Sequence, residues 1–249
     1  MSSPFPAGVF IICKNEEKNL ARALESVKDF AQIVVVDSGS TDGTLEIARR
    51  YTDKVLHQDW LGYSKQKAFA LAQCTQDWVL SLDADEEVTP ALREDLRQVM
   101  TQGQAVAAVV PIGEVFLGKP VPACVKCVAK VRFFRRDAGR YGEELAHEQI
   151  RVDGPTAQVK GCIRHYGETS IAVKVEKNNA YSSLKAKEKL DKGKRPSLAR
   201  LVLAMPFAFA KDYVLRRNCL NGWRGFVASV INGFYAFMKE AKVWEGASK

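Results

Sequence analysis

The sequence predicts an α/β protein whose mostly parallel sheet is flanked by helices and followed by a basic helical extension at the C-terminal end. Two observations carry this prediction. Over the first 100 residues, short apolar runs alternate four times with segments of helical spacing, the pattern of a parallel sheet with right-handed crossovers. From residue 171 onward the chain is patterned as helix and is rich in lysine and arginine. With 249 residues, 47% hydrophobic and 27% charged, the chain is typical of a globular protein, which argues against disorder.

The elements of the first part each have a local reason. Buried parallel strands appear as short continuous apolar runs, and VFIIC, IVVV and WVLSL are such runs. The first helix places Leu20 and Leu24 on one face, residues 40–43 supply a turn and N-cap before the second, and Pro90 starts the fourth. The expected strands are 9–13, 33–36, 54–58 and 78–82, and the expected helices are 16–27, 44–51, 64–73 and 91–100.

Beyond residue 105 the regular alternation ends. Strands are expected at 106–111, 130–135 and 159–165, separated by glycines, prolines and charges. The clearest break lies at 193–196, between a lysine-rich helix and the helical segment 198–243. We therefore expect one domain at 1–170, built from the halves 1–104 and 105–170, and a helical region at 171–249.

Positive charge is concentrated in the helical region. Residues 174–249 hold 16 of the 37 Lys and Arg residues but only 6 of the 29 Asp and Glu residues, so they account for more than the whole net charge of +8. Such asymmetry favours an anionic partner, whether nucleic acid, acidic lipid or a phosphorylated molecule.

The chain shows no signal peptide and no membrane span by sequence. The first residues lack a basic segment, and the longest apolar stretch, 198–210, contains Arg200 and Pro206 and is shorter than the roughly 20 residues that span a bilayer. These features predict a cytoplasmic protein. Among the six cysteines, Cys124 and Cys127 form a C-x-x-C pair with no second pair at zinc-site spacing, so free thiols are the simpler interpretation than a metal or redox site.

Polar side chains cluster where the predicted strands end. Glu16 follows the first strand, Asp37 the second, and Asp83 and Asp85 the fourth. The carboxyl ends of parallel strands share one edge, where such sheets bind ligands. Residues i and i+2 of an extended strand project to the same side, so Asp83 and Asp85 would repel each other unless a cation such as Mg²⁺ or Mn²⁺ lay between them. No G-x-G-x-x-G or Walker lysine pattern is present, which argues against dinucleotide-binding and P-loop proteins.

Three blocks in this order, ICKNEEKNLARALESV, IVVVDSGSTDGTLEIA and WVLSLDADE, resemble the nucleotide-sugar half of inverting family 2 glycosyltransferases of the GT-A type, with a Rossmann-like sheet. A later segment, from ELAHEQIRVDG to GCIRHYGETS, resembles the subgroup that adds a sugar to the inner core of lipopolysaccharide. The resemblance covers residues 7–170 well and the basic tail less specifically. There we expect an acid before a glycine, and this chain has Asn221 instead.

The resemblance implies roles for individual residues. Glu16 and Asp37 match positions that hold the ribose and uracil of a UDP-sugar, and Lys65 and Lys67 lie where the family contacts the nucleotide or its phosphates. Asp83 matches an acid near the ribose and metal, and Asp85 matches the direct metal ligand. The remaining assignments, again by resemblance, are Glu148 as the general base, with Glu143 and Glu144 as nearby rivals, and His165 as a residue that reaches the metal or diphosphate.

The implied function is transfer of a sugar, glucose by resemblance, from a UDP-sugar to a lipopolysaccharide inner-core acceptor by a single displacement. Residues 1–104 would bind the donor and 105–170 would bind the acceptor and supply the base. A polyprenyl phosphate or another glycan is an alternative acceptor. A non-enzymatic nucleic-acid- or glycan-binding protein is an alternative of another class, although no nucleic-acid-binding motif is present and we expect no nucleic-acid partner.

The basic tail has three interpretations that do not exclude one another. Basic residues beside aromatic and aliphatic ones suit docking to an anionic membrane surface or to a lipid acceptor. Membrane docking would make the protein peripheral on the cytoplasmic face of the inner membrane. Packing against the catalytic domain and an oligomer contact are the alternatives.

Overall fold

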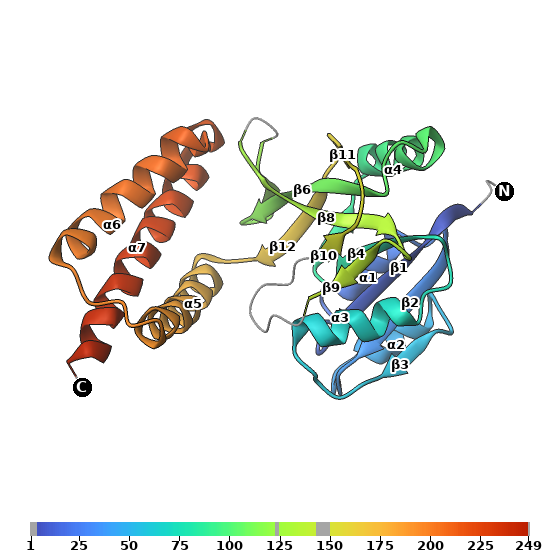
Figure 1. The fold of residues 1–249 in the computed structure, drawn as a ribbon, viewed down its shortest axis with the longest axis horizontal. Coiled ribbons are helices and arrows are strands. Elements are labelled where there is room, and N and C mark those ends of the chain that lie inside the picture. Colours follow the sequence, from blue (N-terminus) through green and yellow to red (C-terminus); the bar gives the residue numbers. More distant parts are fainter. Residues whose placement is uncertain (1–3, 123–124, 143–149, 249) are drawn as a thin grey trace. The chain divides into compact units, whose positions relative to one another are not determined.

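The computed structural model describes residues 4–122, 125–142 and 150–248. The chain forms two compact units (Figure 1). The first comprises Met1–Gly113 and Val128–Tyr166, and the second comprises Glu114–Cys127 and Gly167–Lys249. The segment 114–127 thus clusters with the C-terminal helices, although it lies far from them in sequence.

The parallel half of the sheet follows the predicted alternation. Its strands are β1 (Phe5–Cys13), β2 (Phe30–Asp37), β3 (Val55–His57) and β4 (Trp78–Asp83), in the spatial order β3-β2-β1-β4. Between them lie α1 (Leu20–Glu25), α2 (Thr44–Arg49) and α3 (Tyr63–Ala72), and α4 (Pro90–Gln102) follows. All three neighbouring pairs among these four strands are parallel.

The sheet continues beyond β4 with mainly antiparallel pairings, and one short strand pairs in parallel. The order is β4-β8-β6-β12-β5, with β8 (Val128–Arg135), β6 (Ala107–Phe116), β12 (Ile163–Glu168) and β5 (Glu86–Val88). β11 (Thr156–Gln158) pairs with β6, and β9 (Gly139–Tyr141) and β10 (Ile150–Val152) form a separate two-stranded ribbon. The expected strands 106–111 and 130–135 are both found, longer than expected.

Apolar side chains cover both faces of the sheet, which explains why its strands are continuous apolar runs rather than alternating ones. Val9 and Ile11 of β1 pack with α1 and α4 on one face, while Phe10 packs with Val34 and α3 on the other. In α4, Thr89 caps the N-terminus by accepting a hydrogen bond from the backbone N–H of Leu92, 3.3 Å away. Burial on both faces makes the central strands a rigid base for the loops at their ends.

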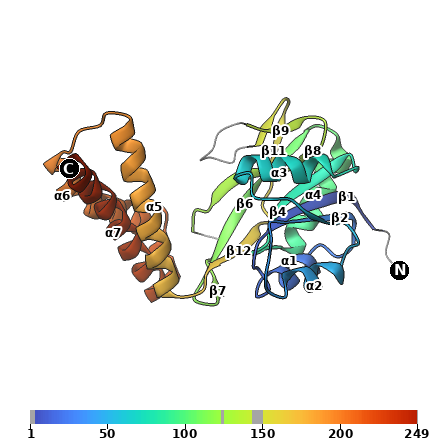
Figure 2. The same ribbon diagram turned by 90° about the horizontal axis from the view of Figure 1, so that it is seen from below.

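The second unit is built from helices and a short hairpin (Figure 2). The end of β6 pairs with β7 (Lys119–Pro120), and the helices are α5 (Ile171–Asp191), α6 (Leu198–Ala210) and α7 (Gly222–Ala247). Both α5 and α6 pack against α7. The predicted break after the lysine-rich helix is present, with Gly193 in the left-handed region at φ 67°.

The segment 198–243, expected as helical throughout, is interrupted. A π-helical turn, η1 (Lys211–Leu215), follows α6, and a 3₁₀ turn, η2 (Asn218–Asn221), precedes α7. The buried carboxylate of Asp212 accepts hydrogen bonds from Asn218 and Ser229 at 2.9 Å and from Asn232 at 3.1 Å. At the interruption, hydrogen bonds to Asp212 therefore join η1, η2 and α7.

Candidate functional site

The register of the sheet brings the strand-end acids to one edge. Cys13 at the end of β1 lies opposite Asp37 at the end of β2, and Ile12 lies opposite Asp83 at the end of β4. The prediction that these acids share one rim of the parallel sheet is therefore met by the strand register.

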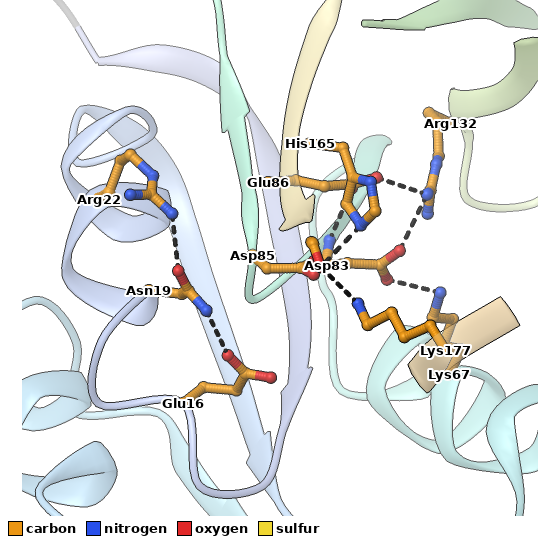
Figure 3. Close-up of polar contacts among 11 residues, drawn as sticks. Glu16, Asn19, Arg22, Lys67, Asp83, Asp85, Glu86, Arg132, His165 and Lys177 are labelled. Carbon is orange, nitrogen blue, oxygen red and sulfur yellow. Dashed lines mark hydrogen bonds and ion pairs between the residues drawn. The ribbon is translucent and has the colours of Figure 1, made fainter. Parts of the chain in front are cut away.

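Asp83 lies between two buried cations (Figure 3). Its carboxylate oxygens contact Lys67 Nζ at 2.6 Å and Arg132 Nη2 at 2.9 Å. Arg132 also contacts Glu86 Oε1 at 2.8 Å, and Glu86 Oε2 accepts the backbone N–H of Asp83 at 2.9 Å. The side chains of Lys67, Arg132 and Glu86 are 5%, 8% and 2% exposed, whereas that of Asp83 is 31% exposed. The network thus presents the carboxylate of Asp83 to solvent and hides the groups that hold it.

Burial and nearby charges shift the pKa values of the two acids of this network, Asp83 and Glu86, in opposite directions. Burial alone would raise the pKa of Asp83, but Arg132 and Lys67 outweigh it and hold that pKa well below its usual value. Burial, with the nearby charge of Asp83, raises the pKa of Glu86 to about 7. Although burial opposes its charge, the two carboxylates raise the pKa of Arg132 above its usual value. Asp83 is therefore a fixed anion, and Glu86 exchanges a proton near neutral pH.

A β-bulge aims Arg132 at the site. In the β6–β8 pair, Ala108 lies opposite Phe133 but Val109 lies opposite Val131, so Arg132 is an extra residue without a counterpart on β6. Without the bulge, strict alternation would place Arg132 and Phe134 on the same face of β8. Arg132 Nε is buried and has no hydrogen-bond acceptor within the described part of the chain. Within the described residues, Arg132 therefore has an unused N–H donor close to Asp83.

Asp85 lies in the turn after β4 and has a different partner. His165 Nε2 is 3.1 Å from Asp85 Oδ2, because β12 pairs with β5 and sets His165 opposite Glu86. The backbone N–H of Tyr166 also donates to the carbonyl oxygen of Asp85 at 2.9 Å. Both side chains of this pair are open to solvent, 22% exposed for Asp85 and 27% for His165.

The expectation that Asp83 and Asp85 lie together on an extended strand needs correction. Asp83 ends β4, Asp85 belongs to the turn, and Lys67 and Arg132 already neutralise Asp83. Repulsion between the two acids is therefore relieved by the protein itself. Across the described ranges no cluster of three His, Cys, Asp or Glu side chains is placed to hold a metal ion. Asp85 and His165 remain as a two-residue candidate set.

The loops after β1 and β2 are fastened to each other. Asp37 is 1% exposed, and its carboxylate accepts the backbone N–H groups of Gly39 and Ser40 at 2.9 Å and also the Ser40 hydroxyl. Asn15 adopts φ 56°, and its side-chain oxygen accepts the N–H of Thr41 at 2.8 Å. Asp37 thus shapes the loop that borders the site, and a direct contact between Asp37 and a nucleoside stays a prediction.

Glu16 starts a separate polar chain. Asn19 Nδ2 donates to Glu16 Oε2 at 2.9 Å, and Asn19 Oδ1 accepts from Arg22 Nη2 at 2.8 Å (Figure 3). The Arg22 guanidinium lies 3.5 Å from the ring centroid of Tyr166. Because Tyr166 also bonds to Asp85, this chain connects the loop after β1 with the turn that carries Asp85. The backbone N–H of Glu16 donates to Thr44 Oγ1 at 2.8 Å.

The two predicted lysines are not equivalent. Lys67 is buried at the network, but Lys65, two positions earlier on α3, is exposed and is not part of it. Two positions on a helix are about 200° apart, so one side chain faces the sheet and the other faces solvent. Glu148, with its rivals Glu143 and Glu144, lies outside the described residues.

The sequence alone missed three contributors: Arg132, Glu86 and the Arg22–Tyr166 contact. Arg132 carried a signal, since it is a charged residue inside the apolar strand segment VRFF, whereas Glu86 lies in the acidic run DADEEV and carried none. Such charges are buried only when they are paired.

Comparison of the sequence with known proteins assigns the chain to a family. The model for "Glycosyl transferase family 2" matches residues 8–144. The "Lipopolysaccharide core biosynthesis glycosyltransferase LpsC" of Rhizobium meliloti (strain 1021) is 33% identical over 259 residues, which cover 98% of this chain and 94% of that protein. The "Uncharacterized glycosyltransferase RP128" of Rickettsia prowazekii (strain Madrid E) is 35% identical over 248 residues, 94% of this chain and 85% of that protein.

A crystal structure of S. aureus TarS has a TM-score of 0.50 and 17% sequence identity, and the match covers 94% of this chain and 55% of that chain. At this identity the likeness concerns the fold alone. Together with the family match, it confirms the predicted α/β architecture of the GT-A type, a mostly parallel sheet flanked by helices.

Proposed function

Because the chain belongs to glycosyl transferase family 2 and is a glycosyltransferase, we propose that it moves a sugar from a UDP-sugar, UDP-glucose by preference, to a lipopolysaccharide inner-core acceptor. The observation that carries the proposal is that two acids lie at the carboxyl edge of the parallel sheet. Lys67 and Arg132 hold Asp83 in place, and the side chain of Asp85 is open to solvent. The relative from Rhizobium meliloti, named for lipopolysaccharide core biosynthesis and matched along nearly its whole length, supports the acceptor.

The donor would lie over the edge formed by β1, β2 and β4. Glu16, Asp37 and the loop they border would hold the uridine, and the exposed face of Asp83 would accept from its ribose hydroxyls. Lys67 and Arg132 fix the Asp83 carboxylate at 2.6 and 2.9 Å, so it needs no reorganisation when the donor binds. Lys65 would act from the solvent side as a charge near the phosphates.

Asp85 and His165 are the side chains that would hold a divalent cation, Mg²⁺ or Mn²⁺. Carboxylate oxygen and imidazole nitrogen are suitable ligands, and cations of this kind are often held by one or two protein side chains with substrate phosphates and water completing the shell. The exposure of both side chains fits such an open site. When bound, the ion would supply neutralisation of the negative charge that develops on the departing UDP.

The protein's own residues would perform the remaining chemistry. Glu148 would accept the proton of the acceptor hydroxyl as that oxygen attacks the anomeric carbon from the face opposite UDP, which inverts the configuration in a single displacement. No covalent enzyme intermediate is needed, and the transition state would resemble the oxocarbenium ion of glycoside hydrolysis.

UDP release from a panel of UDP-sugars, with and without Mn²⁺ and a heptose-containing truncated lipopolysaccharide, tests this proposal. Asp85→Ala and Glu148→Gln should each abolish acceptor-dependent release. Asp59→Ala is the matched control for the first, because Asp59 also lies 3.1 Å from a histidine but is 92% exposed. Glu94→Gln on α4, exposed, is the control for the second. Full activity of Glu148→Gln would contradict the base assignment, and activity only with a polyprenyl phosphate or another glycan would replace the acceptor.

Within the described part of the chain, no helix is long and apolar enough to cross a membrane. We propose peripheral binding of α6 to an anionic lipid surface at the cytoplasmic face of the inner membrane. α6 has no buried residue, and Leu203 and Phe207 are 60% and 71% exposed. The same unit carries Arg200, Arg216 and Arg224, which would contact lipid phosphates. Sedimentation with vesicles that contain phosphatidylglycerol, against vesicles of phosphatidylcholine alone, tests this surface.

A further inference from the structure

The second unit contains a small basic pocket that none of the roles above uses. It has a volume of about 210 Å³ and lies between the C-terminal end of α5, the turn that follows, and the middle of α7. Five lysines line it, together with Glu188 and Tyr235. The five are Lys185, Lys189, Lys192, Lys194 and Lys239.

The acids nearby do not balance this charge. Lys185 pairs with Glu188 at 2.8 Å, and Lys189 and Lys239 share Glu240, the second at 3.8 Å. Lys192 and Lys194 have no ion pair within the residues that the structure describes. Five positive charges thus face two negative ones, which leaves a local excess of three.

Helix capping does not account for the lysines. Cations at a helix C-terminus often compensate the free carbonyl groups there. In α5 the backbone itself does so, since the N–H groups of Lys192, Gly193 and Lys194 bond to the carbonyl oxygens of Glu188, Leu190 and Lys189. The side chains of Lys192 and Lys194 are therefore available for another anion.

The charges also repel one another. Burial, and next the charge of Lys189, lower the pKa of Lys239 below its usual value. Burial raises the pKa of the Tyr235 hydroxyl, so that group stays a neutral O–H donor at physiological pH. An anion bound among these side chains would relieve the repulsion and accept hydrogen bonds from several of them.

We propose that this pocket binds a phosphate monoester group, either free or as the headgroup of a lipid. Its volume is below the 300–1,000 Å³ or so of pockets that hold whole drug-sized ligands, so it suits a single small anionic group rather than a sugar nucleotide. A doubly charged phosphate monoester would offset most of the local excess of three charges, whereas a phosphodiester carries a single charge. The site is independent of glycosyl transfer.

Calorimetric titration of the full chain with inorganic phosphate at low salt tests the site directly. The Lys192→Gln/Lys194→Gln variant should bind about fivefold more weakly or worse, because two charges that line the pocket next to the anion are lost. Lys187→Gln/Lys211→Gln is the matched control, since it removes two charges from exposed positions of the same unit outside the pocket. It should stay within about twofold of the wild type.

A second arm separates the two sources of phosphate. The same proteins are sedimented with phosphatidylcholine vesicles that contain phosphatidic acid, a monoester, or phosphatidylglycerol, a diester. Weaker binding of inorganic phosphate by Lys192→Gln/Lys194→Gln assigns a free ligand. A loss of sedimentation of that variant with phosphatidic acid vesicles alone assigns a lipid headgroup. No loss in either arm, or an equal loss in the control variant, overturns the proposal. Neither arm measures turnover, so failure here leaves the proposed transferase activity standing.

Discussion

Replacement of Arg132 by methionine tests whether the buried network around Asp83 is organised as the structure shows. The guanidinium bridges Asp83 at 2.9 Å and Glu86 at 2.8 Å and is 8% exposed. Removing one partner of a buried ion pair costs about 3–5 kcal/mol. Asp83 keeps Lys67 at 2.6 Å and Glu86 accepts a proton, so we expect the lower end, about 3 kcal/mol at pH 8.

The cost of Arg132→Met should depend on pH. In the wild type Glu86 is mostly protonated at pH 6 and ionised at pH 8, because its pKa is about 7. Only at pH 8 does the variant lose a second charge–charge contact, so the cost should be about 1 kcal/mol smaller at pH 6. Urea unfolding followed by circular dichroism at both values measures this difference.

Arg135→Met supplies the control for this experiment. Arg135 lies on the same strand, but its side chain is 45% exposed and its contact with Asp137 is 3.3 Å long. Surface pairs of this kind contribute at most about 1 kcal/mol. A cost for Arg132→Met equal to that of Arg135→Met at both pH values would refute the reasoning, because it would mean that water solvates Asp83 and Glu86.

Three further predictions concern other parts of the chain. The raised pKa of Glu86 means that the folded state binds more protons than the unfolded state between pH 4.5 and 7. The free energy of unfolding should therefore fall by on the order of 3 kcal/mol as pH rises through this range. Glu86→Gln should remove that fall, and stability–pH curves of the variant and the wild type that run parallel would contradict the prediction. A Cβ on Gly161 would lie 2.3 Å from the backbone of Leu92, so Gly161→Ala should cost more than about 2 kcal/mol in urea unfolding, against less than about 1 kcal/mol for Gly113→Ala, whose nearest contact is 3.6 Å; equal costs would refute the close approach. Phe207→Ser should reduce sedimentation with anionic vesicles several-fold at unchanged melting temperature, because the side chain is 71% exposed, and unchanged sedimentation would remove α6 from the lipid surface.

The parallel half of the fold is predictable from the sequence because burial on two faces leaves a simple signal. VFIIC, IVVV and WVLSL contain no charged residue and only one hydroxyl, that of Ser81. The first acid after each of the last two runs, Asp37 or Asp83, marks the strand's carboxyl end. Strand register then requires these acids to meet at one edge. The convergence of the candidate site is thus a consequence of local patterns and one rule of topology.

The antiparallel half and the network behind Asp83 could not be predicted in the same way. The position of Arg132 depends on a one-residue bulge, and a bulge arises from the pairing of β8 with β6, which no local pattern encodes. The interruption of the segment 198–243 has the same origin. Asp212 is tolerated there because Asn218, Ser229 and Asn232 donate to it, and these partners lie 6 to 20 residues away.

The two acids of the D-x-D motif have different physical tasks because of where the chain turns. Asp83 is the last residue of a strand, with buried Lys67 and Arg132 behind it, so its charge is fixed and most of it is compensated. Asp85 lies in the turn, where its carboxylate meets a histidine and solvent, so its charge is free to meet another cation. A motif of two identical residues therefore contains one carboxylate that buried cations hold in place and one that is open to solvent, where we propose that a cation binds. The asymmetry comes from a lysine on α3 and an arginine on β8, both remote from the motif in sequence.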